Sequence, residues 1–150
     1  MGQFVHLHVH SHYSILDGAS SIDKLISRAL ELGMPGIALT DHGNMFGVKE
    51  FLSKVSKVNG KVNDEIKQLK CDIENAEGEI ERGGGNPAGL EELRLKLKEA
   101  QAKLFKPIVG CETYIAKKSR FDRTDKEDRH NYHLILLAKN KEGYHNLMKL

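Results

Sequence analysis

The sequence has no apolar run of about 18 residues, so it offers no helix that could span a membrane. Its first ten residues lack the basic and then apolar regions of a secretory signal peptide. It has only two cysteines, Cys71 and Cys111, and they form no CxxC pair, which argues against a disulfide framework and suits a reducing compartment. Together these absences predict a cytoplasmic protein.

Net charge is also small. The formal charge of +2 is too low to indicate a nucleic-acid coat protein. With 39% hydrophobic and 29% charged residues, the 150-residue chain is not too polar to fold. It is long enough for one globular domain and short for two. The unusual feature is histidine, with eight residues, four of them within positions 6–12.

The first part of the chain alternates between strand and helix patterns. Residues 4–10 alternate apolar and histidine side chains, which predicts a β-strand with the histidines on one face. Apolar residues at helical spacing predict a helix over 22–33, beginning after a serine cap and ending at a glycine. Residues 36–40 predict a buried strand and residues 46–58 a second helix. This order is typical of a parallel α/β sheet or barrel.

Residues 59–106 depart from that pattern. Apolar residues recur there at intervals of three and four on both sides of a glycine-rich turn at 83–87. Residues 64–82 carry seven acidic and three basic side chains, whereas residues 90–106 carry three acidic and five basic ones. Because opposite net charges favour pairing of the two arms, we predict an inserted antiparallel coiled-coil hairpin. The alternative is two separate amphipathic helices packed on the body.

The α/β pattern returns after this segment. Residues 108–116 predict a strand, and residues 117–131 predict a charged loop with little apolar content. Residues 133–138 predict a further buried strand, and a helix begins at residue 143.

His8 and His10 are the first candidate metal ligands. Residues two apart on a strand face are about 6.7 Å apart along the backbone, which lets two imidazoles converge on one metal or on two neighbouring metals. Imidazole nitrogen is a good ligand for zinc and similar ions. The alternative is a pair of buried, hydrogen-bonded histidines, which would need a partner for every ring nitrogen.

Further candidates follow the predicted strands. Asp41 and His42 come directly after the strand at 36–40, and active sites in parallel α/β folds gather at the carboxyl ends of strands. We therefore take Asp41 and His42 as candidate catalytic residues. Asp17, Glu112 and His133 lie near other strands. Taken alone, Asp17 could be a turn former, Glu112 a solvated acid and His133 a buried, hydrogen-bonded histidine.

The remaining histidines are weaker candidates for metal ligands: His6, His12, His130 and His145. The sequence has no Ser-His-Asp order, and its triple glycine follows a helix rather than a strand, so it does not form a phosphate-binding loop. Nitrogen and oxygen ligands in excess of four indicate more than one metal. Clustered metals suit the hydrolysis of phosphate esters.

Several strings then resemble a known family. HLHVHS, SILDGA and IALTDHGNMFG resemble the first two motifs of the PHP (polymerase and histidinol phosphatase) superfamily. KPIVGCETYIA, SRFDR and HLILLAKNKEGYHNLMKL narrow the resemblance to the amino-terminal PHP domains of bacterial replicative DNA polymerases. The resemblance covers residues 3–57 and 106–150.

The resemblance implies a distorted (β/α)7 barrel with a metal cluster at its strand ends. Residues 1–150 would form its N-terminal part as a fragment, interrupted by the hairpin at 59–106. Zinc or manganese is implied, up to three ions in the complete domain. The ligands carried over by this resemblance are His8, His10, Asp17, His42, Glu112 and His133.

The implied activity is a metal-dependent 3′–5′ exonuclease in a DNA polymerase, with DNA and other holoenzyme subunits as partners. Further family motifs are expected beyond Leu150. Part of a barrel leaves a sheet edge unpaired, and such an edge predicts self-association with another copy of the chain. One alternative is a free-standing PHP phosphatase of small phosphate monoesters. Another is a non-catalytic scaffold in which the hairpin, with its acidic arm, contacts protein rather than DNA.

Overall fold

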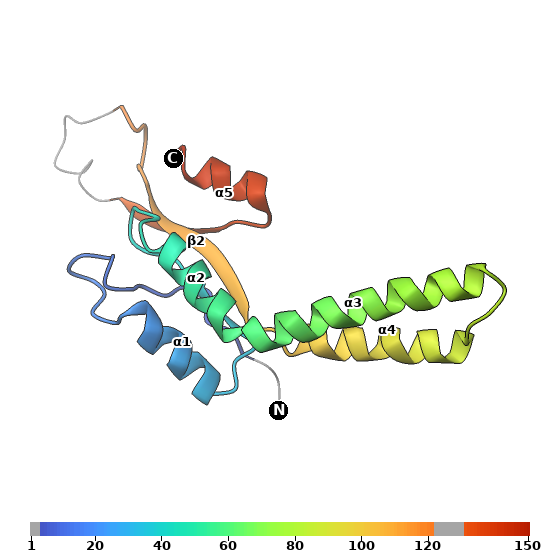
Figure 1. Cartoon of the computed structure of the whole chain (residues 1–150). Coiled ribbons are helices and arrows are strands. Elements are labelled where there is room, and N and C mark those ends of the chain that lie inside the picture. The colour runs from blue at the N-terminus through green and yellow to red at the C-terminus, as the bar shows by residue number, and fades with distance from the viewer. Residues whose placement is uncertain (1–3, 122–130) are drawn as a thin grey trace. The chain divides into compact units, whose positions relative to one another are not determined.

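The computed structural model describes residues 4–121 and 131–150 of a mixed α/β protein (Figure 1). Most of the predicted loop at 117–131, including His130 and the end of the SRFDR string, lies outside the described residues. The chain divides into two compact units, Met1–Val55 with Lys106–Leu150, and Ser56–Phe105. Helices and strands are α1 (Ile22–Glu31), β1 (Gly36–Leu39), α2 (Val48–Val58), α3 (Gly60–Glu81), α4 (Pro87–Ala102), β2 (Lys106–Ile115), β3 (Tyr132–Leu137) and α5 (Lys141–Leu147).

The helix predicted after the serine pair is confirmed as α1. The Ser21 side chain accepts a hydrogen bond from the Lys24 amide at 3.4 Å, which caps the first turn. Ile22, Ile26 and Ala29 lie on one face and are buried, and the helix contacts β1. A stripe of apolar residues at helical spacing therefore covers one side of the sheet, as the sequence pattern predicts.

The sheet is mixed rather than parallel. β1 pairs with β2 in parallel, with Gly36 opposite Lys106, whereas β2 pairs with β3 in antiparallel fashion. The parallel arrangement predicted from the first part of the chain therefore holds for β1 and β2 but does not extend to β3. A parallel pair needs a crossover connection, usually a helix, whereas an antiparallel pair does not. The charged segment at 117–131 has no apolar stripe with which a crossover helix could pack.

The regular strand predicted at residues 4–10 is also wrong. The segment lies along β1, where the His6 carbonyl accepts from the Ala38 amide and the Val9 carbonyl from the Thr40 amide, both at 2.9 Å. The step from His6 to Val9 covers three residues, whereas the matching step from Ala38 to Thr40 covers two. The backbone of the first segment bends at residues 7–8. The extra residue interrupts the strict alternation of side chains.

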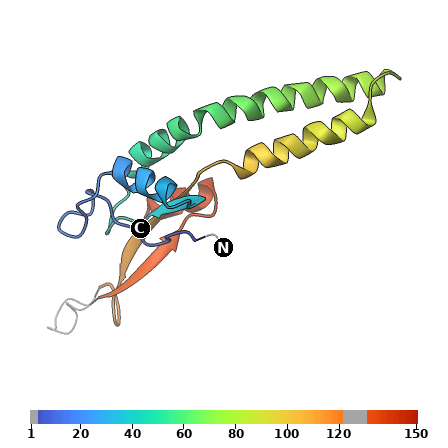
Figure 2. The same ribbon diagram turned by 90° about the horizontal axis from the view of Figure 1, so that it is seen from below.

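The unit Ser56–Phe105 is a pair of helices. Figures 1 and 2 both show α3 and α4 side by side, joined by the glycine-rich turn. Arg94 of α4 pairs with Glu77 of α3 at 2.9 Å, so the acidic and basic arms meet as predicted. At the other end of the pair, the buried Asn59 side chain hydrogen-bonds both backbone groups of Phe105, at 2.8 and 3.0 Å. The coiled-coil geometry and the status of residues 59–106 as an insertion stay predictions.

Candidate metal centre

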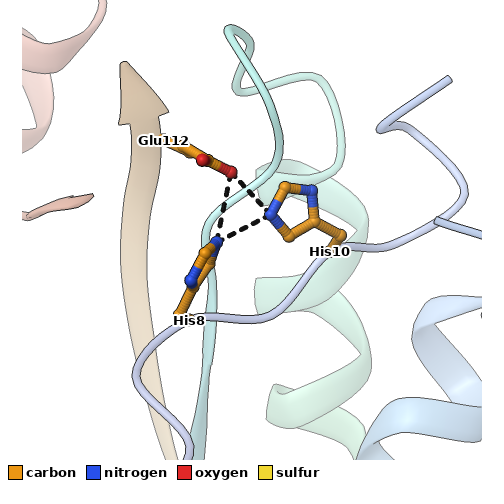
Figure 3. Close-up of side chains that lie close together, drawn as sticks. All are labelled: His8, His10 and Glu112. Atoms are coloured by element: carbon orange, nitrogen blue, oxygen red, sulfur yellow. Dashed lines mark hydrogen bonds and ion pairs between the residues drawn. The ribbon is translucent and has the colours of Figure 1, made fainter. Parts of the chain in front are cut away.

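Three side chains from two distant parts of the sequence meet at one point (Figure 3). Nε2 of His8 and Nε2 of His10 lie 2.8 Å apart, and both face Oε2 of Glu112, at 3.1 Å and 2.7 Å. The centroids of the two rings lie 4.9 Å apart, so the predicted convergence of His8 and His10 is present in the structure. His8, His10 and Glu112 form the first ligand group, and their ligand atoms all lie within 4.8 Å of one another.

The backbone fixes Glu112 beside His42. The Glu112 carbonyl accepts from the Gly43 amide at 2.8 Å, and the Glu112 amide donates to the Asp41 carbonyl at 3.1 Å. These bonds continue the pairing of β1 and β2 beyond the end of β1. Glu112 is therefore held at the carboxyl end of β1, where sequence reasoning expects the site.

A second ligand group consists of His10, Asp17 and His42. Oδ2 of Asp17 lies 3.0 Å from Nδ1 of His42, and the same nitrogen is 3.7 Å from Oε2 of Glu112. His10 belongs to both groups, so the two groups are contiguous. A short loop after the first histidines places Asp17 here, although an aspartate in that sequence context is also typical of a turn.

His133 completes the set that the resemblance predicts. It lies near the start of β3, opposite Tyr114 in the antiparallel register, and its Nδ1 contacts Oε1 of Glu112. Its ring lies edge-on to that of His42, with centroids 5.0 Å apart. The structure thus brings together all six residues carried over as ligands, around the carboxylate of Glu112.

The carboxyl group of Glu112 has a lowered pKa. Burial raises the pKa of the Glu112 carboxyl, but the hydrogen bond from His8 and the charges of His10 and His133 outweigh that effect. The pKa of Glu112 is therefore below its usual value, and the group is ionised at neutral pH. A deprotonated carboxylate among imidazole nitrogens is the donor set that zinc and manganese bind in proteins. The residues present therefore fit a metal centre.

Asp41 does not join either ligand group. Its carboxylate is 1% exposed and accepts hydrogen bonds from Ser11 and Ser14. The catalytic role of Asp41 stays a prediction. His12 is exposed, His145 lies in α5, and neither they nor His6 belong to a ligand group among the described residues.

Sequence reasoning missed Tyr114 as a site residue. Its hydroxyl contacts Nε2 of His42, and its ring lies 4.7 Å from that of His42 and 5.1 Å from that of His133. The signal was its position two residues after Glu112 on a predicted strand, which places both side chains on one face.

The fold and the site define an α/β protein with a cluster of histidines and carboxylates at a strand end that could hold a metal ion. The family model of the PHP domain matches residues 6–150, and the chain belongs to the PHP domain family.

The chain is similar to DNA polymerase III subunit alpha from several bacteria. It is 43% identical to that of Treponema pallidum (strain Nichols) over 148 residues, which cover 98% of this chain and 9% of the relative. It is 39% identical to the subunit of Borreliella burgdorferi over 99% of this chain, and 37% identical to that of Aquifex aeolicus over 98%, again covering 9% of each relative. The chain thus spans about a tenth of the length of these curated relatives.

Among the described residues, no helix is long and apolar enough to cross a membrane.

Proposed function

We propose that this chain is the PHP domain of a bacterial DNA polymerase III alpha subunit, and that its metal centre is a 3′–5′ exonuclease site. The observation that carries the proposal is the convergence of His8, His10, His42 and His133 on the single buried carboxylate of Glu112. The similarity to alpha subunits supports DNA as the substrate. In the whole protein, the partners would be DNA and other holoenzyme subunits in the cytoplasm.

The two ligand groups would hold divalent metals, zinc or manganese, up to three in the complete domain. His8, His10 and Glu112 would hold one ion, and His10, Asp17 and His42 a neighbouring one. Such ions, when bound, lower the pKa of water and stabilise charge on phosphate oxygens. This chemistry suits the cleavage of a phosphodiester bond.

The chain's own residues give the site a closed side and an open side. Glu112 is 3% exposed and forms the closed side. The side chains of His8, Asp17 and His133 are each about half exposed and face solvent. Tyr114 is also half exposed, so its hydroxyl is within reach of a phosphate group that approaches His42. A DNA end can therefore approach the ligands from the open side.

We further propose that the unit containing β1, β2 and β3 forms part of a distorted (β/α)7 barrel into which residues 59–106 are inserted. The parallel pairing of β1 with β2 and the placement of the site at the carboxyl end of β1 support this architecture. The antiparallel β3 is one of its distortions.

The experiment that tests the function compares two substrates. The purified chain, supplied with zinc or manganese, is incubated with a 3′-labelled DNA strand and, separately, with a small phosphate monoester. We expect loss of the 3′-terminal nucleotide from DNA, and no such loss with His42→Ala. Release of phosphate from the monoester with intact DNA ends would contradict the proposal and favour the free-standing phosphatase.

A further inference from the structure

Asp41 is buried next to the metal centre but serves the backbone around it. Its Oδ1 accepts hydrogen bonds from the Ser11 amide at 2.7 Å, the Ser11 hydroxyl at 3.0 Å and the Ser14 hydroxyl at 2.8 Å. Its Oδ2 accepts from the Ser11 hydroxyl at 2.9 Å. A buried carboxylate is stable only when it is hydrogen-bonded in this way, so the contacts restrict the arrangement of the loop.

The two partners of Asp41, Ser11 and Ser14, lead to the three members of the second ligand group. Ser11 directly follows His10 in the chain. The hydroxyl of Ser14 accepts a hydrogen bond from the His42 amide at 2.9 Å. The backbone carbonyl of Ser14 accepts one from the Asp17 amide at 3.0 Å. The three ligands of this group therefore lie on segments that are connected through one buried carboxylate.

Two glycines allow the loop to close around that carboxylate. A Cβ atom at Gly18 would lie 2.0 Å from the carbonyl oxygen of Ser11. A Cβ atom at Gly47 would lie 3.1 Å from Oδ2 of Asp41 and 2.8 Å from the ring of Tyr13. A side chain at Gly18 would displace the backbone of Ser11, and one at Gly47 would crowd Tyr13 and Asp41 itself.

We propose that Asp41 is a positioning residue, which holds Asp17 and Nδ1 of His42 side by side before a metal binds. This inference rests on the metal binding proposed above. Preorganisation removes an ordering cost that binding would otherwise have to meet. Because Asp41 acts on the loop and on His42, its loss should affect the second ligand group more than His8 and Glu112.

The first test is the zinc affinity of the whole 150-residue chain, measured by competition with a chromophoric chelator. Asp41→Asn preserves side-chain size, but its amide nitrogen cannot accept a hydrogen bond. Ser14→Ala removes the hydroxyl between Asp41 and His42, and serves if Asp41→Asn does not fold. We expect each change to weaken zinc binding by about 10–100-fold, the usual effect of losing a group that orients metal ligands.

Asn59→Ala is the matched control for stability. It removes a buried hydrogen-bonding side chain in the helical unit, so it should lower the melting temperature without changing zinc affinity. Zinc affinity at the parent value in both Asp41→Asn and Ser14→Ala, or a loss no greater than that of Asn59→Ala, would overturn the inference.

A metal-free readout separates this inference from the proposed function. Amide hydrogen exchange at Ser11, Asp17 and His42 should accelerate in Asp41→Asn and Ser14→Ala, and should match the parent chain in Asn59→Ala. If the parent chain binds no zinc, the proposed function fails, and exchange alone decides whether Asp41 holds the loop. Parent-like exchange at all three amides in both variants would then show that it does not.

Discussion

Nε2 of His8 lies 3.1 Å from Oε2 of Glu112, although 104 positions separate the two residues in the sequence. Two successive pairings explain this proximity. The carbonyls of His6 and Val9 accept hydrogen bonds from the amides of Ala38 and Thr40, so the segment that carries His8 lies along β1. β1 in turn pairs in parallel with β2, and the pairing continues to His42 opposite Glu112. The candidate metal centre therefore depends on contacts between segments that are distant in the sequence.

The closure of the loop after the first histidines depends on Gly18. Because a Cβ there would meet a backbone oxygen at 2.0 Å, Gly18→Ala forces the backbone to move. We expect it to lower the free energy of unfolding by at least about 1–3 kcal/mol, as overpacking does, and to weaken zinc binding.

Gly60→Ala is the control for this change, because a Cβ at Gly60 has no atom within 4 Å. In helix α3 it should be neutral or stabilise by up to about 1 kcal/mol. Urea unfolding of both variants measures the difference. Equal stability of the two variants would contradict the role assigned to Gly18.

The two cysteines should react very differently with thiol reagents. Cys71 is exposed on α3, whereas Cys111 is buried on β2. Burial raises the pKa of the Cys111 thiol, and hydrogen bonds with the backbone at Asn44 and Gly43 offset only part of the effect. A raised pKa means less of the reactive thiolate at a given pH.

The native chain at pH 7 should therefore take up one equivalent of a thiol reagent rapidly, and a second only in denaturant or slowly as the pH rises. Cys71→Ser should abolish the fast phase, and mass spectrometry counts the labels. Rapid uptake of two equivalents by the native chain would show that β2 is more accessible than the structure indicates.

Asn59 should contribute strongly to the stability of the helical unit. Asn59→Ala leaves the buried backbone groups of Phe105 without their side-chain partners, which costs about 1–3 kcal/mol. Thermal unfolding followed by circular dichroism measures the loss. Asn63→Ala, at an exposed position of α3, should cause no comparable destabilisation. The same melting temperature for both variants would refute the contribution assigned to Asn59.

Self-association remains a prediction that the structure now makes specific. β3 lies at one end of the sheet order β1-β2-β3, and within the described ranges it pairs with β2 alone. Its side chains include the exposed Tyr132, Leu134 and Leu137. An exposed apolar edge strand tends to pair with another chain, and a lysine on the edge opposes this.

Sedimentation velocity at tens of micromolar should therefore detect a dimer of the parent chain, and less of it for Leu134→Lys. A parent chain that remains monomeric at this concentration would count against pairing through β3.

Local patterns account for the parts of the fold that sequence analysis predicted well. The apolar stripe and serine cap of α1, and the buried run that becomes β1, depend on neighbours in the chain. The bend at residues 7–8 and the antiparallel direction of β3 depend instead on hydrogen bonds between distant segments, which periodicity does not encode.

The candidate site shows the same division. The spacing of His8 and His10 indicates that their rings can converge, whereas Glu112 and His133 enter the set through family resemblance. The orientation of Asp41 could not be predicted from the sequence, because its carboxylate could either bind a metal or accept hydrogen bonds from nearby serines. Only the tertiary contacts with Ser11 and Ser14 distinguish these possibilities.

The most direct test of the central claim is the metal content of the chain after gentle purification, measured by elemental analysis alongside the His8→Ala/His10→Ala double variant. The site geometry predicts at least one zinc or manganese ion per parent chain. The site geometry also predicts that the double variant loses this metal. The helical content of the double variant should be nearly unchanged, because both histidines lie outside the helices. The same metal content in the parent chain and the double variant, or no metal in a parent chain supplied with zinc and manganese, would contradict it.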